Sequence, residues 1–192
     1  MDKITLVFAS NNQHKLSEIQ SKIGEQFEVV SLQQIGCSEE IPETGSTLET
    51  NASLKSQHVV KNYGKNCFAD DSGLEIFALD GQPGVDSAHY AGDRDADKNM
   101  DLVLLKMQGI KDRRARFRTV ISLVLDGDEH LFEGVVNGNI RNGKCGAAGF
   151  GYDPIFEPEG YDITFAEMSL DEKNKISHRA KAVEKLIAFL KG

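Results

Sequence analysis

The stretch from Gly149 to Phe156, GFGYDPIF, contains residues suited to binding a small molecule. Its glycines allow a ligand to approach the main chain closely. The Phe150 ring offers a flat face for a base, and Asp153 offers an acceptor for a hydroxyl group or a donor edge. These residues predict a pocket for a nucleotide, although such a turn on its own is also compatible with a plain hairpin corner.

Two adjacent acids, Asp70 and Asp71, follow a predicted buried strand and precede Ser72. Adjacent carboxylates at a strand end suit Mg²⁺, which prefers one or two carboxylates together with waters and phosphate oxygens. A third acid, Glu43, lies in the polar loop PETG and is placed to complete such a site. The alternative is that both aspartates cap a turn and that Glu43 is solvated.

A second polar loop, Ser10 to Lys15, lies between a predicted strand and a predicted helix and reads SNNQHK. Its amides and the helix N-terminus present a partial positive charge, and Lys15 adds a full one. With these groups the loop is predicted to bind phosphate in a manner similar to a P-loop. The P-loop pattern itself, G-x-x-x-x-G-K-[ST], occurs nowhere in the chain. An ordinary turn capped by Ser10 or Asn12 is the alternative.

Near the C-terminus, Lys173, Ser177, His178 and Arg179 fall within seven residues. In one continuous helix, Lys173 and Ser177 share a face. If Ser177 instead caps a new helix, it breaks the first and frees His178 and Arg179 for a pocket. The sequence leaves both arrangements open, as well as a merely solvated helix face.

Three arginines, Arg114, Arg116 and Arg118, alternate along a predicted strand and would share one face. They suggest a track for phosphates. No aromatic residues interleave with them to stack bases, and the net charge of -8 opposes attraction to nucleic acid. We therefore expect a strand facing solvent or a second subunit, and no nucleic-acid partner.

Strands and helices alternate along the chain and must position these residues. Ile4 to Ala9 reads as a buried strand, and Leu16, Ile19 and Ile23 follow at helical spacing. The mixed order predicts an α/β or α+β sheet with helices packed on it. Two further helices are predicted by capping boxes: one begins at Ser46 and Glu49 and ends near Gly64, and a C-terminal helical region begins at Ser169 and Glu172. Two strands, Cys67 to Ala69 and Leu74 to Leu79, are predicted with DDSG as an interruption between them. An antiparallel pair, Arg114 to Leu125 and Glu129 to Val136, is predicted with Asp126-Gly127 as its turn.

The size and composition predict a single domain spanning residues 1–192, because 40% apolar residues suffice for one buried core. The three cysteines, Cys37, Cys67 and Cys145, lie far apart, which fits neither a disulfide framework nor a zinc site. We expect no clustering of histidine with cysteine. No segment approaches the roughly 20 apolar residues of a membrane span, so we expect a soluble, cytoplasmic protein without a membrane partner.

Taken together, the motifs resemble those of the inosine triphosphate pyrophosphatase family over about Phe8 to Ala182. The resemblance implies metal-dependent hydrolysis of ITP, dITP or XTP to a nucleoside monophosphate and pyrophosphate. It further implies Mg²⁺, with Mn²⁺ as an alternative, and a homodimer built on an elongated mixed sheet flanked by helices, with a substrate cleft between two lobes. The matching segments are FASNNQHK, PETGSTLETNASLKS, FADDSGLEIFAL, PGVDSAHYAG, RARF, GFGYDPIF and SLDEKNKISHRAKA.

The same resemblance implies roles for individual residues. Asp71 is the expected proton acceptor and, with Glu43, a metal ligand. The expected substrate contacts are Ser10, Asn11, Asn12, Gln13, His14, Lys15 and Lys55 around the triphosphate, Ser72 beside them, Phe150, Gly151, Tyr152 and Asp153 around the sugar and base, and Lys173, His178 and Arg179 as readers of the base.

The chain departs from the family pattern at three places. Asn11 stands where glycine is usual, His89 stands in SAHY where arginine is common, and Ala147-Ala148 replace a pair that usually contains glycine. Two rival functions remain open. One is a pyrophosphatase for another modified nucleotide, such as a methylated pyrimidine, and the other is a nucleotide sensor without turnover. Retention of Glu43 and Asp71 argues against the sensor.

Overall fold

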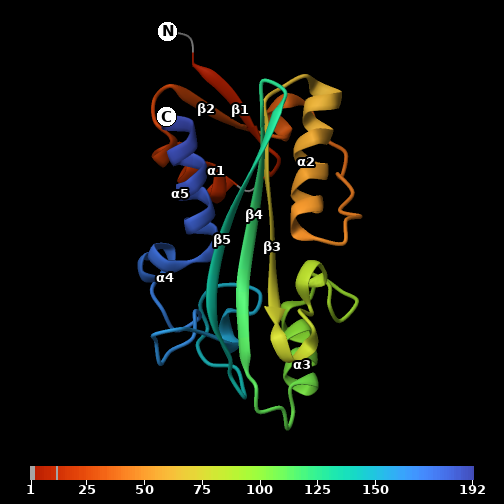
Figure 1. The fold of residues 1–192 in the computed structure, drawn as a ribbon, viewed down its shortest axis with the longest axis vertical. Coiled ribbons are helices and arrows are strands. Elements are labelled where there is room, and N and C mark those ends of the chain that lie inside the picture. Colours follow the sequence, from red (N-terminus) through yellow and green to blue (C-terminus); the bar gives the residue numbers. More distant parts are fainter. Residues whose placement is uncertain (1–2, 12) are drawn as a thin grey trace. The chain divides into compact units, whose positions relative to one another are not determined.

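The computed structural model describes residues 3–11 and 13–192, apart from the side chains of Gln13, His14, Ser17, Glu18 and Ser21. Strands and helices follow one another in mixed order (Figure 1). The helices are α1 (Gln13–Ile23), α2 (Leu48–Tyr63), α3 (Ala96–Lys106), α4 (Leu170–Ile176) and α5 (His178–Lys191). The strands are β1 (Ile4–Phe8), β2 (Phe27–Ser31), β3 (Cys67–Ile76), β4 (Arg114–Leu125), β5 (Asp128–Ile140) and β6 (Phe156–Pro158).

The strands form one mixed sheet in the order β2-β1-β3-β4-β5-β6. Strand β1 pairs in parallel with β2 and β3, whereas β5 and β6 are antiparallel. The turn between β4 and β5 contains Asp126 and Gly127, both with positive φ, as a two-residue hairpin turn requires. The predicted α/β fold with a mixed sheet and the predicted hairpin are confirmed.

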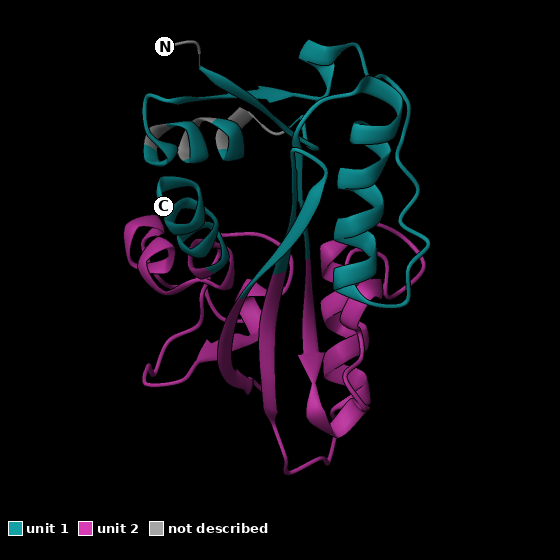
Figure 2. Cartoon of the chain, turned by 45° about the horizontal axis from the view of Figure 1, so that its top comes forward, with its two compact units in different colours: residues 1–71, 120–133, 182–192 teal, residues 72–119, 134–181 magenta. Residues whose placement is uncertain are grey.

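The chain divides into two compact units, which Figure 2 colours separately. Unit 1 comprises residues 1–71, 120–133 and 182–192, and unit 2 comprises residues 72–119 and 134–181. The boundaries fall inside β3, β4, β5 and α5, so these elements contribute residues to both units. The single domain over 1–192 stays a prediction.

Unit 1 buries both faces of its part of the sheet, because successive residues of a strand point to opposite faces. Leu6 and Phe8 belong to an apolar cluster with residues of α1 and α5. Val7, between them, belongs to a second cluster that contains Val59 of α2. Helices α1 and α5 therefore pack on one face of β1, and α2 packs on the other.

Unit 2 has its own apolar core, which contains three aromatic rings in mutual contact. Phe117 lies 4.6 Å from Phe156 and 6.1 Å from Phe165, between ring centroids. Met100 and Val103 bring α3 into the same cluster. This core lies beneath the GFGYD turn, since Tyr152 also belongs to it.

Strand β3 differs from its prediction in two respects. It ends at Ile76, because residues Phe77–Leu79, predicted as strand, form the 3-10 helix η2. The DDSG segment, residues 70–73, was expected to interrupt two strands, but β3 runs without a break from Cys67 to Ile76. Aspartate and glycine are depleted in strands as a tendency of packing rather than as a rule of the backbone. Here β3 lies between β1 and β4 in the sheet, and this position inside the sheet outweighs the low propensity of its residues.

The start of α2 also differs from its prediction by one residue. Thr47, not Ser46, is the N-cap, because its hydroxyl accepts a hydrogen bond from the Thr50 amide at 3.1 Å. Gly64 ends the helix in a left-handed conformation, near the predicted position. The capping box of Ser169 and Glu172 is confirmed.

Three elements were missing from the prediction, namely β2, α3 and β6. Strands β2 and β6 are short, with five and three residues, and carry no long periodic pattern. Helix α3 does carry one, because Met100, Val103, Leu104 and Met107 stand at helical spacing after the N-cap Asp95, and the prediction overlooked it. In the part of the chain that the structure describes, no helix has the length and apolarity needed to cross a membrane.

Candidate active site

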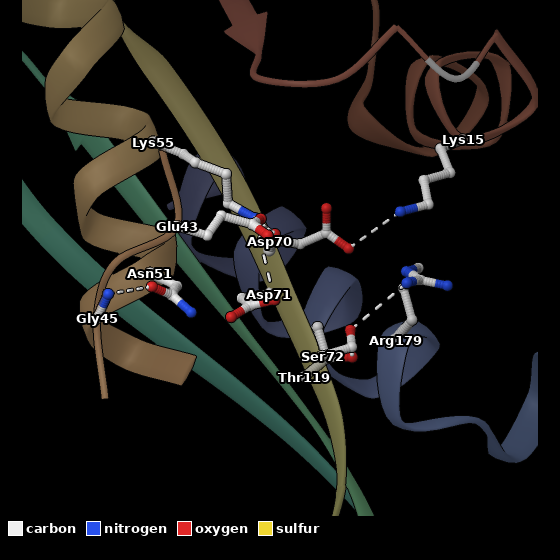
Figure 3. Close-up of polar contacts among 10 residues, drawn as sticks. All are labelled: Lys15, Glu43, Gly45, Asn51, Lys55, Asp70, Asp71, Ser72, Thr119 and Arg179. Atoms are coloured by element: carbon white, nitrogen blue, oxygen red, sulfur yellow. Dashed lines mark hydrogen bonds and ion pairs between the residues drawn. The ribbon is translucent and has the colours of Figure 1, made fainter. Parts of the chain in front are cut away.

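Asp70 and Asp71 are consecutive in β3, and each contacts a lysine from a different helix (Figure 3). The Asp70 carboxylate lies 3.4 Å from Nζ of Lys15, in the first turn of α1. The Asp71 carboxylate lies 4.0 Å from Nζ of Lys55, on α2. Because α1 and α2 cover opposite faces of the sheet, strand alternation gives the two aspartates different surroundings.

Lys55 joins the predicted metal ligands. Its ammonium donates to Glu43 Oε1 at 2.5 Å and to the Asp70 carbonyl oxygen at 2.7 Å, besides approaching Asp71. Two carboxylates from distant parts of the sequence therefore converge on one cation. Carboxylate oxygens are the ligands that Mg²⁺ prefers, so the chemistry of this pair fits a divalent cation.

Asn51 holds the loop that carries Glu43, and the sequence prediction missed it. The Gly45 amide donates to Asn51 Oδ1 at 2.7 Å, and Asn51 is buried. A Cβ atom added to Gly45 would lie 2.7 Å from that oxygen and 2.8 Å from Thr50 Cβ, so the loop packs closely on the start of α2. The sequence signal was the glycine of PETG, six residues before an asparagine.

The loop expected to bind phosphate is only partly described. Asn12 and the side chains of Gln13 and His14 lie outside the described residues. The Asn11 side chain accepts a hydrogen bond at 2.9 Å from the amide of Gln33, at the start of the 3-10 helix η1 (Gln33–Ile35). This departure from the family pattern therefore ties the loop to η1. Ser10 precedes it and is half-buried.

In unit 2, Ser72 has two polar partners. Its hydroxyl lies 2.7 Å from that of Thr119 on β4, and Nη2 of Arg179 donates to it at 3.4 Å. Figure 3 shows Arg179 directed toward Ser72 from the start of α5. The structure thus brings together two of the predicted substrate contacts, Ser72 and Arg179.

The GFGYD turn presents one aromatic ring to solvent. Phe150 is 65% exposed, which is unusual for a ring of this size and suits stacking on a base. Asp153 is buried, where it accepts a hydrogen bond from the Phe150 amide at 2.8 Å and forms an ion pair with Lys173. In this structure Asp153 positions the turn, and its contact with substrate stays a prediction.

The neighbours of Phe150 differ in exposure. Tyr152 is buried, and its hydroxyl donates to the Ser87 carbonyl oxygen at 2.8 Å. Burial raises the pKa of Tyr152, so this hydroxyl stays protonated at neutral pH. Gly151, with φ of +61°, makes the turn between them.

Two predicted base readers lie beside the Phe150 ring. Nζ of Lys173 is 4.6 Å from the ring centroid, and Cζ of Arg179 is 5.9 Å from it. Cations at such distances are attracted to the negative electrostatic potential above the face of an aromatic ring. The third reader, His178, is buried and stacks on Phe117 with centroids 4.8 Å apart.

Ser177 separates two helices. Helix α4 ends at Ile176, and the Ser177 backbone is extended, with ψ of 150°. Its hydroxyl accepts a hydrogen bond from the Ala180 amide at 3.1 Å. Of the two alternatives left open by the sequence, Ser177 as the cap of a new helix is confirmed, and Lys173 lies on a different helix from His178 and Arg179.

The arginines of β4 have acidic partners. Arg116 and Arg118 contact Glu75 at 2.6 and 2.9 Å, and Arg114 contacts Asp112 at 2.8 Å. These ion pairs account for the alternating arginines without a phosphate track.

Among the described residues, Cys37, Glu39 and His58 form a group whose potential ligand atoms all lie within 4.8 Å of one another. The expectation that histidine and cysteine would not cluster is therefore wrong. It relied on spacing along the sequence, whereas His58 reaches the other two from α2.

The other two departures from the family pattern each make a polar contact. The exposed His89 ring lies 3.6 Å from the Asp86 carboxylate. The Ala148 amide donates to the Ala166 carbonyl oxygen at 3.1 Å, which holds the segment before the GFGYD turn.

Known proteins resemble this chain over nearly its whole length. Residues 6–189 match the model of the Ham1 family. A dITP/XTP pyrophosphatase from Flavobacterium psychrophilum is 54% identical over 187 residues, which cover 97% of this chain and 98% of that protein. One of the same name from Porphyromonas gingivalis is 51% identical and covers 96% of each.

Solved structures agree with these sequence matches. The structure of the Staphylococcus aureus Ham1 protein superposes with a TM-score of 0.94 at 44% identity, covering 98% of both chains. The nucleoside-triphosphatase, or dITP/XTP pyrophosphatase, from Mycobacterium abscessus gives a TM-score of 0.84 at 40% identity, covering 95% of this chain and 98% of that one.

Proposed function

Because the chain belongs to the Ham1 family, we propose that it hydrolyses deaminated purine nucleoside triphosphates, ITP, dITP and XTP, to a nucleoside monophosphate and pyrophosphate. Relatives that cover nearly the whole chain are named for this activity. The observation that carries the proposal is the convergence of Glu43 and Asp71 on Lys55, since hydrolysis of a triphosphate needs both a base and positive charge.

Asp71 accepts the proton of the attacking water in this proposal. A positioned general base of this kind typically contributes 10²- to 10⁴-fold to the rate. Lys15 and Lys55 provide positive charge for the phosphate oxygens as the α-β bond breaks. Glu43 and Asp71 are the residues that would hold Mg²⁺, or Mn²⁺ in its place, and this ion would offset the negative charge of the triphosphate.

The base stacks on Phe150, the exposed ring of the GFGYD turn. Hypoxanthine and xanthine carry an O6 acceptor where adenine carries an amino donor. A donor fixed at that point, from Arg179 or Lys173, favours the first two and rejects adenine. A site that leaves buried groups unpaired with the wrong ligand discriminates by roughly 10⁴-fold.

Three further parts of the proposal come from the family resemblance or from the composition of the chain. We expect a homodimer, a cytoplasmic enzyme that clears the nucleotide pool used by polymerases, and no nucleic-acid partner. Sedimentation of the purified chain measures the first, and a monomer at all concentrations would contradict it.

Release of pyrophosphate from ITP, XTP, ATP and GTP, with and without Mg²⁺, tests the reaction and its selectivity. We expect fast release from ITP and XTP that depends on the metal, and slow release from ATP. Guanine shares the O6 acceptor, so slow release from GTP requires that shape or an opposing donor refuse its 2-amino group. Release of orthophosphate instead would place the cleavage at another bond.

A comparison of Asp71→Asn with Asp70→Asn tests the assignment of the base. Both changes remove one charge from adjacent residues of the same strand. We expect Asp71→Asn to lower kcat by at least about 10²-fold and Asp70→Asn to lower it much less. The opposite ranking would assign the proton acceptor to Asp70.

The rival functions give different results in the same assay. Turnover of a methylated pyrimidine triphosphate in preference to ITP would identify a pyrophosphatase for another modified nucleotide. Binding of ITP without any release of pyrophosphate would identify a nucleotide sensor.

A further inference from the structure

Cys37, Glu39 and His58 gather on unit 1, at positions the pyrophosphatase reaction does not use. Their potential ligand atoms lie within 4.8 Å of one another, and His58 Nε2 is 3.0 Å from Glu39 Oε1. Cys37 is buried, whereas a quarter of the His58 side chain is exposed. The group therefore combines a protected sulfur atom with an imidazole that solvent reaches.

The backbone on both sides of the group is held in place. Gly36 ends η1 in the left-handed conformation, and the Cys37 amide donates to the Leu32 carbonyl oxygen at 3.0 Å. This turn places Cys37 and Glu39 two residues apart beside α2, which carries His58. Cys37 also packs in the same apolar cluster as Val59, the neighbour of His58 on α2.

A further residue orients the carboxylate. The Tyr63 hydroxyl lies 2.9 Å from both oxygens of Glu39. Hydrogen-bonding partners of this kind fix the orientation of metal ligands.

We propose that Cys37 Sγ, the Glu39 carboxylate and His58 Nε2 bind a zinc ion. Zinc takes thiolate, imidazole and carboxylate ligands at about 2.0–2.3 Å in a tetrahedron, so such ligand atoms lie roughly 3.3–3.6 Å apart. A group already within 4.8 Å needs only small side-chain movements to reach this spacing. Three protein ligands leave the fourth position for water.

The chemistry of these ligands separates this site from the expected magnesium site. A thiolate and an imidazole select zinc and similar transition metals, whereas Mg²⁺ prefers oxygen ligands alone. Glu43 and Asp71 offer only oxygen. The zinc ion would link residues 37–39, which precede the Glu43 loop, to the helix that carries Lys55.

Titration of the full chain with Co²⁺, a spectroscopic substitute for zinc, tests the proposal. A thiolate bound to Co²⁺ gives a charge-transfer band in the near ultraviolet, which Co²⁺ on carboxylates alone does not give. We expect this band to saturate at one Co²⁺ per chain and to disappear when Zn²⁺ is added. Cys37→Ser and His58→Gln should each abolish the one-to-one band or weaken Co²⁺ binding at least 10-fold.

Cys145→Ser is the matched control, because it removes another thiol, one that lies in unit 2, and should leave the band unchanged. The proposal is overturned if the wild-type chain gives no band, if the band survives in Cys37→Ser, or if it is lost in Cys145→Ser. Zn²⁺ should also raise the Tm of the wild-type chain but not that of His58→Gln. This second measurement decides the matter if Cys37→Ser does not fold, and an equal rise of Tm in both proteins would also overturn the proposal.

Discussion

Asp153 and Lys173 form an ion pair that is nearly removed from water, with 4% and 10% of their side chains exposed. Removing one partner of such a pair leaves a buried charge without compensation, which typically costs about 3–5 kcal/mol. We therefore expect Lys173→Met to lower the free energy of unfolding by about this amount, measured by urea denaturation.

The double variant Asp153→Asn with Lys173→Met provides the control for that prediction, because it removes both charges. It should regain a substantial part of the lost stability. If Lys173→Met alone costs less than about 1 kcal/mol, the pair is not the structural anchor of the GFGYD turn.

At the scale of single residues, the sequence identified which side chains could do chemistry. It did not show which partners each side chain contacts or which side chains are buried. The pair Asp70-Asp71 looks symmetric in sequence. Only the packing of α1 and α2 on opposite faces gives Asp71 a lysine shared with Glu43. Similarly, nothing in GFGYDPIF says that Asp153 is buried while Phe150 is exposed.

At the scale of elements, the loop that carries Glu43 depends on Asn51 and Gly45. Asn51→Ala would leave the Gly45 amide without its acceptor, at a cost of about 1–3 kcal/mol if that amide stays buried. We expect this variant to require several-fold more Mg²⁺ for half-maximal activity, because Glu43 loses its fixed position. Titration of pyrophosphate release with Mg²⁺ measures the effect.

Thr50→Ala is the neighbouring control, since it changes the same turn of α2 without removing the Asn51 side chain. It should keep a near-normal Mg²⁺ requirement. An unchanged requirement in Asn51→Ala would show that Glu43 is positioned by other contacts.

The break between α4 and α5 depends on the Ser177 hydroxyl, which caps α5. Loss of a serine cap typically costs about 1 kcal/mol, so Ser177→Ala should lower the free energy of unfolding by about that amount. We also expect a weaker preference for ITP over ATP, because His178 and Arg179 open this helix. Ser177→Thr retains a capping hydroxyl without placing a charge at this buried position and should lose less stability, and equal losses in both variants would contradict the capping role.

The elements that the sequence predicted well are those with local signals. The hairpin turn Asp126-Gly127 and the capping box at Ser169 depend on residues close in sequence. The continuity of β3 through DDSG depends instead on the strands β1 and β4 on either side of it, which are distant in sequence. The cluster of Cys37 with His58 likewise requires knowledge of where α2 packs, which no local pattern contains.

At the scale of the whole molecule, unit 1 draws its core from three separate segments of the chain. Leu186, on α5, is fully buried in the same cluster as Leu6 and Phe8. Truncating such a leucine to alanine typically costs about 2–5 kcal/mol. We expect Leu186→Ala to lower the free energy of unfolding by this amount. The unfolding midpoints reported by different spectroscopic probes should all shift together.

Coincident transitions would support the single domain over residues 1–192, because two-state unfolding gives the same midpoint for every probe. Scanning calorimetry checks it by comparing the calorimetric and van't Hoff enthalpies. Two separate transitions, with only one shifted by Leu186→Ala, would instead identify units 1 and 2 as separate folding domains. Leu105→Ala, at an exposed position, is the control. It should change neither the free energy of unfolding nor the midpoint of any transition.

The place of α5 in the core of unit 1 also bears on synthesis of the protein in the cell. The segments that carry Leu6, Phe8 and Phe68 are synthesised well before Val183, Leu186 and Leu190, which pack in the same cluster. Until α5 has been synthesised, α1 covers only part of the apolar face that includes Leu6 and Phe8. Nascent chains that expose such surfaces are prone to aggregate, so we expect this protein to need chaperones most while α5 is still being synthesised.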